Sequence, residues 1–417
     1  MKRVLALCLL FTPFLFMACD DDDDDNGGNG MATFTVTIEN VNPAYDYFST
    51  DSLDAVAPGE SLSFSFNAGQ GHYLSFANMF VQTNDVFFAP EATGIALYDE
   101  SGVALTGDIT ELIALWDAGT EENEAPGEGP NQAPRQEAPN TGTDEGGVVS
   151  LLSDVQDGFT YPAVNELIQV TVEHDGGTLF TVTIANLSDN SNLPSPVSPG
   201  VYVIHFTDQM PLFEVGEKAS EGLEAIAEDG MSTTMFTDLS ENSGLVTPFA
   251  PGAFFVGESN EIFMMSEAAS AALEALAEDG DVAEYTDVFN TPEGETAVGP
   301  IGPGGAYTFT FEAEDGDRLS LATMFIQSND WFVGLDQLSL FDSNGEPISG
   351  DVTEEALLYD AGTEVDEYAG AGANQAPRQA GPNTGEDEGG VVEEETSPSA
   401  NVPEEVSTYL RITIEAQ

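Results

Sequence analysis

Short stretches in which apolar and polar residues alternate recur along the chain. The clearest are 34–38 and 180–184, which both read Phe-Thr-Val-Thr-Ile, followed by 62–66 and 307–311. Because successive side chains of a strand point to opposite faces, this period of two predicts strands with one buried face. Turn signals rich in Gly, Pro and Asp separate the strands. The expected fold class is therefore all-β, with antiparallel β-sandwiches.

A helical spacing interrupts the alternation between about residues 205 and 282. Apolar residues at 219, 223, 226 and 227 precede Gly230, and those at 269, 273, 276 and 277 precede Gly280. A Pro-Gly-led apolar strand comes before each of them, so this strand-plus-helix unit is itself doubled. We expect the helices to cover a core rather than to present a binding face.

The chain is an internal duplication. Segment 74–85 recurs as 319–330, and the later matches, from 97–99 with 340–342 to 139–142 with 382–385, share one offset of 243 residues. A repeat of this length and regularity indicates tandem domains. We expect a first sandwich at 32–175 and a second at 176–417, with the helical insertion at about 205–282 in the second only. The loops 121–147 and 364–400 are rich in Gly, Pro and acids, yet their sequence is repeated, which favours functional loops with flexible tips.

The first 31 residues have the pattern of a targeting segment. Lys2 and Arg3 precede an apolar run from 4 to 18, which is too short to span a bilayer and is typical of a signal peptide, 1–18. The run ends at Ala18-Cys19, which resembles the lipobox of bacterial lipoproteins, where the Cys is lipidated. The alternative is an ordinary cleaved signal with an incidental Cys.

Residues 19–31 are predicted to form an acidic, Gly-rich tether. Six aspartates follow Cys19 and cannot bury apolar surface. An acidic run behind a lipidated Cys also resembles an export signal for the outer face of an outer membrane; the alternative is a plain spacer. The expected location is the cell envelope, lipid-anchored in the outer membrane and exposed at the surface.

Charge and cysteine content narrow the possible functions. The 417 residues include 75 Asp or Glu and seven Lys or Arg, for a formal charge of −68. Such a chain repels nucleic acid and anionic membranes, so membrane attachment depends on the lipid at Cys19. Both Cys residues, Cys8 and Cys19, lie near the start, which excludes a disulfide or a Cys nucleophile in the body. The acid excess favours adaptation to concentrated salt, with simple solubility as the alternative.

Three motifs of the second copy carry a family resemblance. They are Asn-Asp-Trp-Phe-Val-Gly-Leu at 329–335, Tyr-Asp-Ala-Gly-Thr-Glu at 359–364 and Gln-Ala-Pro-Arg-Gln at 375–379. The combination resembles the spondin N-terminal domain, known from F-spondin and from bacterial surface proteins. The resemblance implies a C2-like sandwich that holds one calcium ion with three acidic side chains. The first copy matches less well, because Val86 stands where the second copy has Trp331.

Carried onto this chain, the resemblance implies two calcium sites. The implied metal ligands are Asp85, Asp117 and Glu121 in the first copy and Asp330, Asp360 and Glu364 in the second. Calcium prefers six to eight oxygen ligands, which loops rich in carboxylates and carbonyls supply. In so acidic a chain many acids are neighbours by chance, but chance does not preserve the same three positions in both copies. Arg135 and Arg378, at one motif position, are expected to anchor loop carbonyls or a carboxylate, with an anionic ligand as the alternative.

Nothing in the sequence points to catalysis. None of the three histidines, His72, His174 and His205, recurs in the other copy, and no catalytic motif accompanies them. We therefore expect no enzyme but a surface binding or adhesion module with an extracellular protein or glycan partner. The alternative is a structural envelope or spacer protein of a salt-adapted bacterium without a specific ligand. A bivalent module gains avidity from its two copies, whereas a spacer binds nothing selectively.

Overall fold

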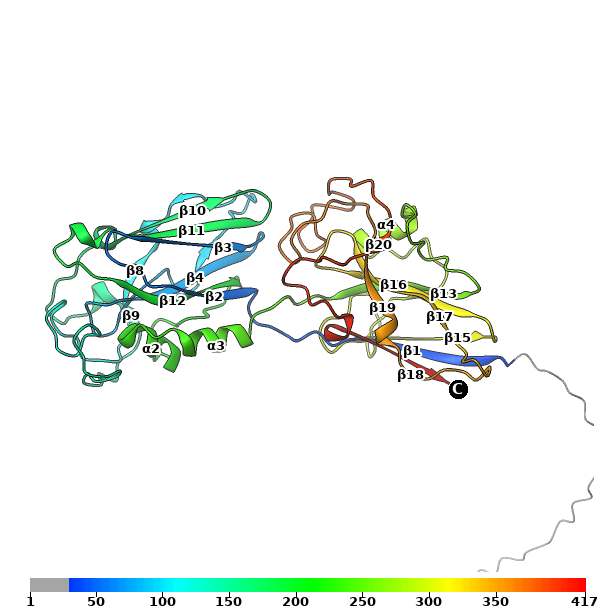
Figure 1. The fold of residues 1–417 in the computed structure, drawn as a ribbon, viewed down its shortest axis with the longest axis horizontal. Helices are drawn as coiled ribbons and strands as arrows, with labels where there is room; N and C mark the ends of the chain where they lie inside the picture. The colour runs from blue at the N-terminus through cyan, green and yellow to red at the C-terminus, as the bar shows by residue number, and fades with distance from the viewer. Residues whose placement is uncertain (1–29) are drawn as a thin grey trace, which may run out of the picture.

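The structure is a computed structural model that describes residues 30–417, so the expected signal peptide, Cys19 and nearly all of the tether lie outside the described residues. It is mostly β, with 34% strand and 12% helix, in antiparallel sheets, which confirms the all-β prediction. The four alternating stretches all form strands. Two lobes lie end to end and are joined by two segments of the chain that run from one lobe to the other (Figure 1). Among the described residues, no helix has the length and apolar character needed to cross a bilayer.

The first domain consists of a seven-stranded sheet stacked on a four-stranded sheet. The larger sheet has the order β2-β12-β4-β5-β8-β9, with β6 beside β4, and the smaller has the order β3-β11-β10-β7. The strands are β2 (Ser49–Leu53), β3 (Ser61–Asn67), β4 (His72–Phe80), β5 (Val86–Ala89), β6 (Ile95–Ala96), β7 (Gly107–Asp108), β8 (Ala114–Asp117), β9 (Ser150–Leu151), β10 (Ile168–His174), β11 (Leu179–Asn186) and β12 (Val197–Phe206). The helices are α1 (Val164–Leu167), α2 (Glu221–Asp229) and α3 (Thr233–Glu241), with 3-10 turns at η1 (Thr110–Leu112), η2 (Leu152–Asp154) and η3 (Ser188–Asn190).

The second domain repeats this architecture. A six-stranded sheet of order β14-β13-β16-β17-β19-β20 lies over a four-stranded sheet of order β15-β1-β21-β18. The strands are β1 (Ala32–Asn40), β13 (Phe249–Gly257), β14 (Val288–Phe289), β15 (Ala306–Ala313), β16 (Arg318–Phe325), β17 (Trp331–Ser339), β18 (Gly350–Asp351), β19 (Ala356–Asp360), β20 (Glu393–Glu394) and β21 (Leu410–Ala416). The helix is α4 (Ala271–Asp279), and the 3-10 turns are η4 (Thr353–Glu355) and η5 (Val406–Thr408).

Strand pairing differs from the expected domain boundaries, 32–175 and 176–417. The N-terminal strand β1 lies between β15 and β21 of the second domain, pairing Val36 with both Phe309 and Ile414. Conversely, β11 lies in the first domain between β3 and β10. The physical reason is local: β10 and β11 are joined by Asp175-Gly-Gly-Thr178, a short turn that closes an antiparallel hairpin. The expected boundary cut that hairpin in two.

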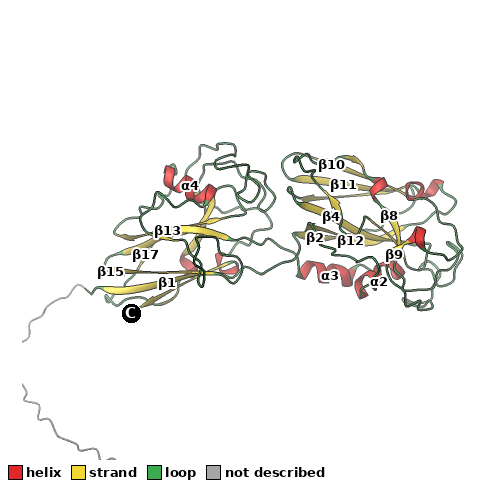
Figure 2. Cartoon of the chain, turned by 180° about the vertical axis from the view of Figure 1, so that it is seen from behind, coloured by secondary structure: helices red, strands yellow, loops and turns green. Residues whose placement is uncertain are grey.

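The expectation of a helical insertion in the second copy alone is also wrong. Helices α2 and α3 pack on β4, β5 and β2 of the first domain, whereas α4 packs on β16 and β17 of the second (Figure 2). Each domain therefore has its own strand-plus-helix unit. In the sequence, the first domain lies between β1 and β13 of the second domain. Its elements therefore follow a circularly permuted order. The first domain begins at β2, the counterpart of β14, and ends with the counterparts of β1, β13 and α4.

Matching contacts support this correspondence. The side chain of Asn40 donates to the carbonyls of Thr247 and Ile301 at 2.9 and 3.1 Å, and that of Asn186 donates to Ser195 and Val56 at 2.8 and 2.9 Å. Helices α2 and α4 are both capped by a serine, Ser220 or Ser270. Both end at a left-handed glycine, and the sequence predicts these two helix ends. Helix α3 was not predicted; its signal is the buried pair Met235 and Leu239, one turn apart.

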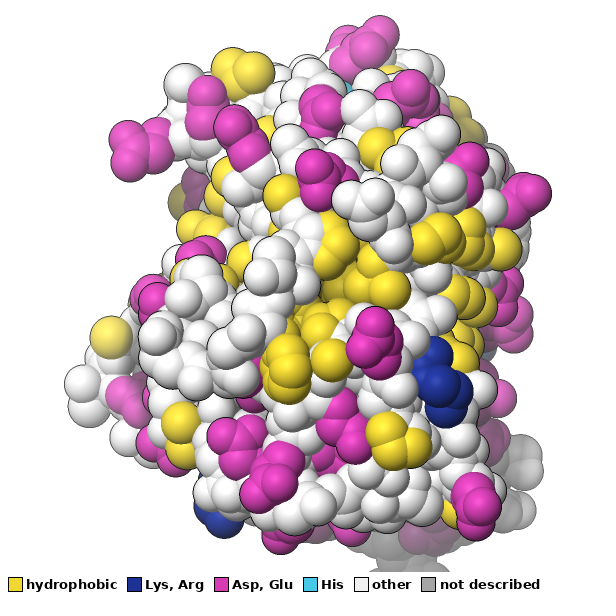
Figure 3. Space-filling view, turned by 90° about the vertical axis from the view of Figure 1, so that its left-hand side faces the viewer, with side chains coloured by type: hydrophobic (Ala, Val, Ile, Leu, Met, Phe, Trp, Pro, Cys, Tyr) yellow, Lys and Arg dark blue, Asp and Glu magenta, His cyan; other side chains and the backbone are white. Residues whose placement is uncertain are grey.

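The acid excess is spread over the surface. In an end-on view of the first domain, acidic side chains are scattered over the whole face, few basic side chains are in sight, and an apolar area lies at the centre (Figure 3). In the described chain one ion pair forms, between Arg411 and Glu39, and both side chains are partly exposed. Because the acids have almost no cationic partners, their mutual repulsion opposes the folded state at low ionic strength.

Candidate metal centres

Each domain brings together three carboxylates from separate loops. In the first domain they belong to Asp85, Asp117 and Glu145, and each offers an oxygen within 4.8 Å of the other two. The second domain repeats the group with Asp330, Asp360 and Glu388. The sequence analysis predicts the two aspartates of each group but not the glutamates. The repeat of Asp-Glu-Gly-Gly-Val-Val at 144–149 and 387–392, with the same offset, is the feature of the sequence that could have identified them.

The first aspartate of each group is fixed by the loop that carries the second. Asp85 follows β4 in a tight turn, and its Oδ2 accepts hydrogen bonds from the backbone N–H groups of Thr120 and Glu121 at 2.8 and 3.1 Å. Asp330 accepts from Thr363 and Glu364 in the same way, at 2.7 and 3.0 Å. Both aspartates are completely buried.

The other oxygen of each buried aspartate has no protein partner. Oδ1 of Asp85 and Oδ1 of Asp330 are both buried and accept no hydrogen bond from any residue that the structure describes. A buried carboxylate oxygen without a partner costs free energy, because its hydration is lost and nothing replaces it. The same orphaned atom in both copies fits a cation ligand.

The second aspartate of each group lies at the end of a strand, before a glycine turn. Asp117 ends β8 and Asp360 ends β19, and their Oδ1 atoms accept from the N–H groups of Gly119 and Gly362 at 2.8 and 2.7 Å. Both glycines have positive φ, +68° and +67°. A Cβ there would also lie about 2.5 Å from the loop that carries the third carboxylate. Only glycine fits such a turn without strain.

Burial and mutual repulsion make these carboxylates hard to ionise. Burial raises the pKa of Asp85, and the charge of Asp117 raises it further. The pKa of Asp330 is raised to about 7 by burial and then by Asp360. The pKa values of Asp117 and Asp360 are raised as well, mainly by burial. Like charges held close together out of water favour either a shared proton or a bound cation.

The expected third ligands, Glu121 and Glu364, have other partners. The carboxylate of Glu121 accepts from the side chain of Asn84 at 3.2 Å and from the N–H of Gly142 at 2.7 Å. Glu364 accepts from Asn329 and Gly385 at 3.3 and 2.7 Å. Among the described residues, neither glutamate belongs to a three-carboxylate group, and both hold the long loops against the domain.

The two centres differ in their neighbours. In the first domain the side-chain amide of Asn123 donates to Oδ2 of Asp117 at 2.6 Å. The second domain has Asp366 at the matching position, and Asp366 forms a further acidic group with Asp360 and Glu395. Burial raises the pKa of Asp366 to about 7, and Asp360 adds to the effect. The second centre is therefore the more negative of the two.

The arginines and the buried histidines that the sequence singles out contact other parts of the fold. The Nε of Arg135 donates to the carbonyl of Gly129 at 2.7 Å, so it anchors a loop, as expected. The matching Arg378 donates to Gly370 of its own loop and to the Gln70 carbonyl of the first domain, where the two domains meet. His72 lies beside it, and burial followed by the Arg378 charge lowers the pKa of His72 to about 3. His205 is fully buried, with Nε2 at 2.9 Å from Ser75 Oγ.

Comparison with known families identifies one relationship. Residues 198–380 match the Spondin_N family model, which supports a spondin N-terminal domain in this part of the chain. The matched segment runs from β12 of the first domain into the loop after β19, and it includes Asp330 and Asp360 but ends before Glu388. No curated protein matches the chain at a significant level.

Proposed function

We propose that this protein is a lipid-anchored cell-envelope module in which two spondin-like domains each bind a calcium ion and serve surface binding or adhesion. The family match supports an extracellular or adhesion-type module. The observation that carries the calcium proposal is the buried, unpartnered Oδ1 of Asp85 and of Asp330, each in a group of three carboxylates. The anchor is proposed from Cys19 and its preceding apolar run.

The chemistry of the donor set favours calcium. Calcium takes six to eight oxygens at about 2.3–2.6 Å in irregular geometry, and carboxylates on loops suit that requirement better than the strict octahedron of magnesium. The ion would supply the positive charge that the buried aspartates lack. Asp85, Asp117 and Glu145 come from three segments, so an ion held by them would join the β4–β5 turn, the end of β8 and the 142–149 loop.

Calorimetry of single-site variants tests the assignment. The wild-type chain is expected to bind two calcium ions, with dissociation constants of about 10⁻⁴ to 10⁻³ M as in other extracellular modules. Asp117→Asn and Asp360→Asn should each remove one ion and leave the other domain saturated. Two ions retained by both variants, or equally tight binding of magnesium, would contradict the proposal.

A matched pair of glutamate variants tests the third ligand. Glu145→Gln is expected to weaken the first site by at least tenfold, because it removes a ligand charge. Glu121→Gln keeps a side chain that can accept from Gly142, so calcium should still bind, while the loop around residue 142 becomes less stable. The opposite ranking would show that Glu121 is the ligand.

Selective capture separates a binding module from a spacer. Purified protein lacking the first 18 residues would be applied to a glycan array and to extracts of neighbouring cells, with calcium and with a chelator. Calcium-dependent retention of a defined glycan or protein is the expected result. Uniform failure to retain anything would favour the structural spacer instead.

A further inference from the structure

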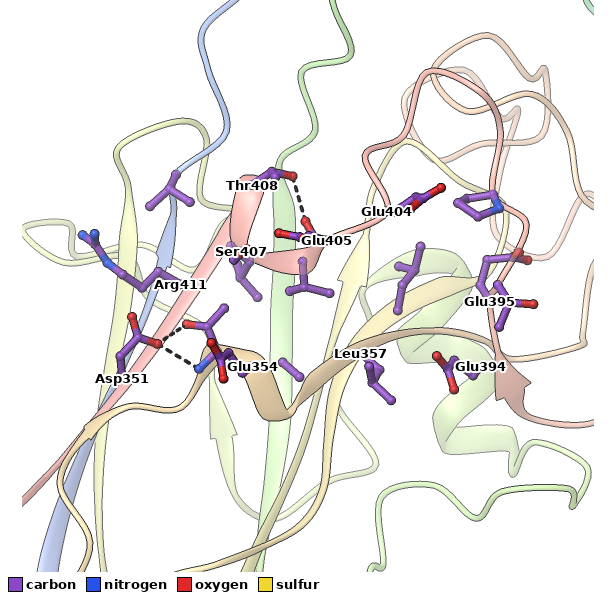
Figure 4. A pocket seen from close by; sticks show the side chains of 18 residues that line it. Asp351, Glu354, Leu357, Glu394, Glu395, Glu404, Glu405, Ser407, Thr408 and Arg411 are labelled. Carbon is purple, nitrogen blue, oxygen red and sulfur yellow. Dashed lines mark hydrogen bonds between the residues drawn. The ribbon is translucent and has the colours of Figure 1, made fainter.

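A wide groove in the second domain lies between the free edges of its two sheets. It has a volume of about 1230 Å³ and runs from β18, past η4 and β19, to β20, with the segment 404–411 along its other side (Figure 4). Leu357, Leu358 and Val406 contribute apolar surface to its wall. This volume exceeds the usual range of small-molecule pockets, about 300–1000 Å³, and suits a polymer better.

Carboxylates surround that apolar surface. Four of them, Glu394, Glu395, Glu404 and Glu405, line the groove together with Glu354 and Asp351. The one cation of the lining, Arg411, already pairs with Glu39. The lining of the groove therefore supplies no free cation to pair with its acids.

The first domain has the same hollow in a smaller and less charged form. Its volume is about 480 Å³, and its lining, which includes Asp108, Thr110 and Glu111, corresponds to Asp351, Thr353 and Glu354. Strand registers align the rest: Trp116 pairs with Leu151 as Tyr359 pairs with Glu394, and Thr171 pairs with Asp108 as Thr413 pairs with Asp351.

The alignment shows what changed between the copies. Leu151 and Leu152 of the first domain correspond to Glu394 and Glu395, and Pro162 and Ala163 correspond to Glu404 and Glu405. Four positions that are apolar in the first domain are thus glutamates around the larger groove of the second. General surface acidity does not explain this, because Leu152 of the first domain is buried in the core.

We propose that this groove binds an extended, Lys- or Arg-rich segment of another protein. Such side chains combine an apolar stem with a charged head, which matches apolar surface bordered by carboxylates. Leu357, 37% exposed, offers a surface for the stems, and Glu354 and Glu394 offer partners for the heads. The edge strands β18 and β20 leave backbone groups for an added chain to pair with. The six aspartates at 20–25 carry the same charge as the groove, which favours a segment of another protein over this segment as the occupant.

The test is a titration of the mature chain with fluorescently labelled hexalysine, followed by anisotropy at physiological ionic strength. In the groove variant Glu354, Glu394, Glu404 and Glu405 are changed to Gln, and Glu395 is kept because it shares an acidic group with Asp360. In the control variant four exposed glutamates elsewhere, Glu60, Glu128, Glu137 and Glu258, are changed to Gln, so both variants lose the same charge. The groove variant should bind at least tenfold more weakly, and the control should change less than twofold.

Two further arms complete the test. Leu357→Ser, an exposed change with little effect on folding, should weaken hexalysine about threefold or more if lysine stems pack on Leu357. Equal weakening in the groove and control variants, no effect of Leu357→Ser, or full competition by spermine would each show diffuse attraction of cations and overturn the proposal. The inference rests on the proposed role as a binding module. Because calcium is counted separately in the same variants, failure of the groove leaves the calcium assignment intact.

Discussion

Strand β1 lies in the second domain and strand β11 in the first. Matched substitutions in these two strands should therefore destabilise opposite domains. Phe34 in β1 is completely buried and packs against Phe311 and Phe341 of the second domain, with ring centroids 5.6 Å away in both pairs. Phe180 in β11 is buried to the same extent and packs against Phe66 and Tyr98 of the first domain, at 5.9 and 5.3 Å. The two phenylalanines occupy the same place in the repeated sequence Phe-Thr-Val-Thr-Ile.

The size of the effect follows from the burial. Replacing a fully buried Phe by Ala costs about 3–5 kcal/mol, from lost transfer free energy and the cavity left behind. In domains of about 200 residues, each kcal/mol lowers Tm by about 2–4 °C, so the affected domain should melt about 6–20 °C earlier. That is a large part of the stability of a typical domain.

The two tryptophans of the chain allow each domain to be followed separately. Trp116 lies in β8 of the first domain and Trp331 in β17 of the second. With the other tryptophan changed to Phe, fluorescence melting reports one domain at a time. Phe34→Ala should lower the Trp331 transition and leave the Trp116 transition in place, and Phe180→Ala should do the reverse. If Phe34→Ala lowers the Trp116 transition instead, β1 belongs to the first domain, and its placement in the second domain is refuted.

Three further predictions concern pH, salt and the anchor. Burial, followed by the Glu364 charge, raises the pKa of Glu278 to about 7, so the folded state binds this proton more tightly than the unfolded chain, and the stability it provides is present below about pH 4.5 and lost as the pH rises through about 7. Glu278→Gln should therefore be more stable than wild type at pH 8.5 by about 1–3 kcal/mol in calcium-free denaturant titrations and equal to it near pH 4; equal stability at both pH values would rule out a buried, protonated Glu278. The melting temperature should rise from low salt to 1 M NaCl at constant calcium, because the Debye length at 1 M is only about 3 Å and the repulsion between acidic side chains is screened. An unchanged melting temperature would contradict the salt-adaptation hypothesis. Radioactive palmitate should label wild type and not Cys19→Ser, whose release from membranes is the second readout; a wild-type protein without label would end the lipoprotein hypothesis.

The sequence predicts the elements of this fold better than their partners. Alternation at 34–38 and 180–184 identifies two strands correctly, but their sequences are identical, so neither pattern says which sheet receives which strand. The deciding feature is the hairpin turn between β10 and β11, which commits β11 to the first domain and leaves β1 to fill the matching place in the second.

The candidate metal centres show the same limit. Duplication and the family resemblance identify Asp85, Asp117, Asp330 and Asp360, because these residues lie at strand ends whose geometry is local. The third carboxylate comes from a loop about 28 residues after the second, and its approach depends on how that loop packs over Gly119 or Gly362. Sequence spacing favours the nearer Glu121 and Glu364, whose carboxylates accept hydrogen bonds from Asn84 and Asn329 in the structure.

Anomalous diffraction from crystals grown with calcium tests the central claim most directly. We expect two calcium peaks per chain, one bonded to Oδ1 of Asp85 with Asp117 and Glu145, and one bonded to Oδ1 of Asp330 with Asp360 and Glu388, at about 2.3–2.6 Å from the oxygens. Crystals with saturating calcium but no peak at either aspartate, or with ions only on exposed surface acids, would contradict the account.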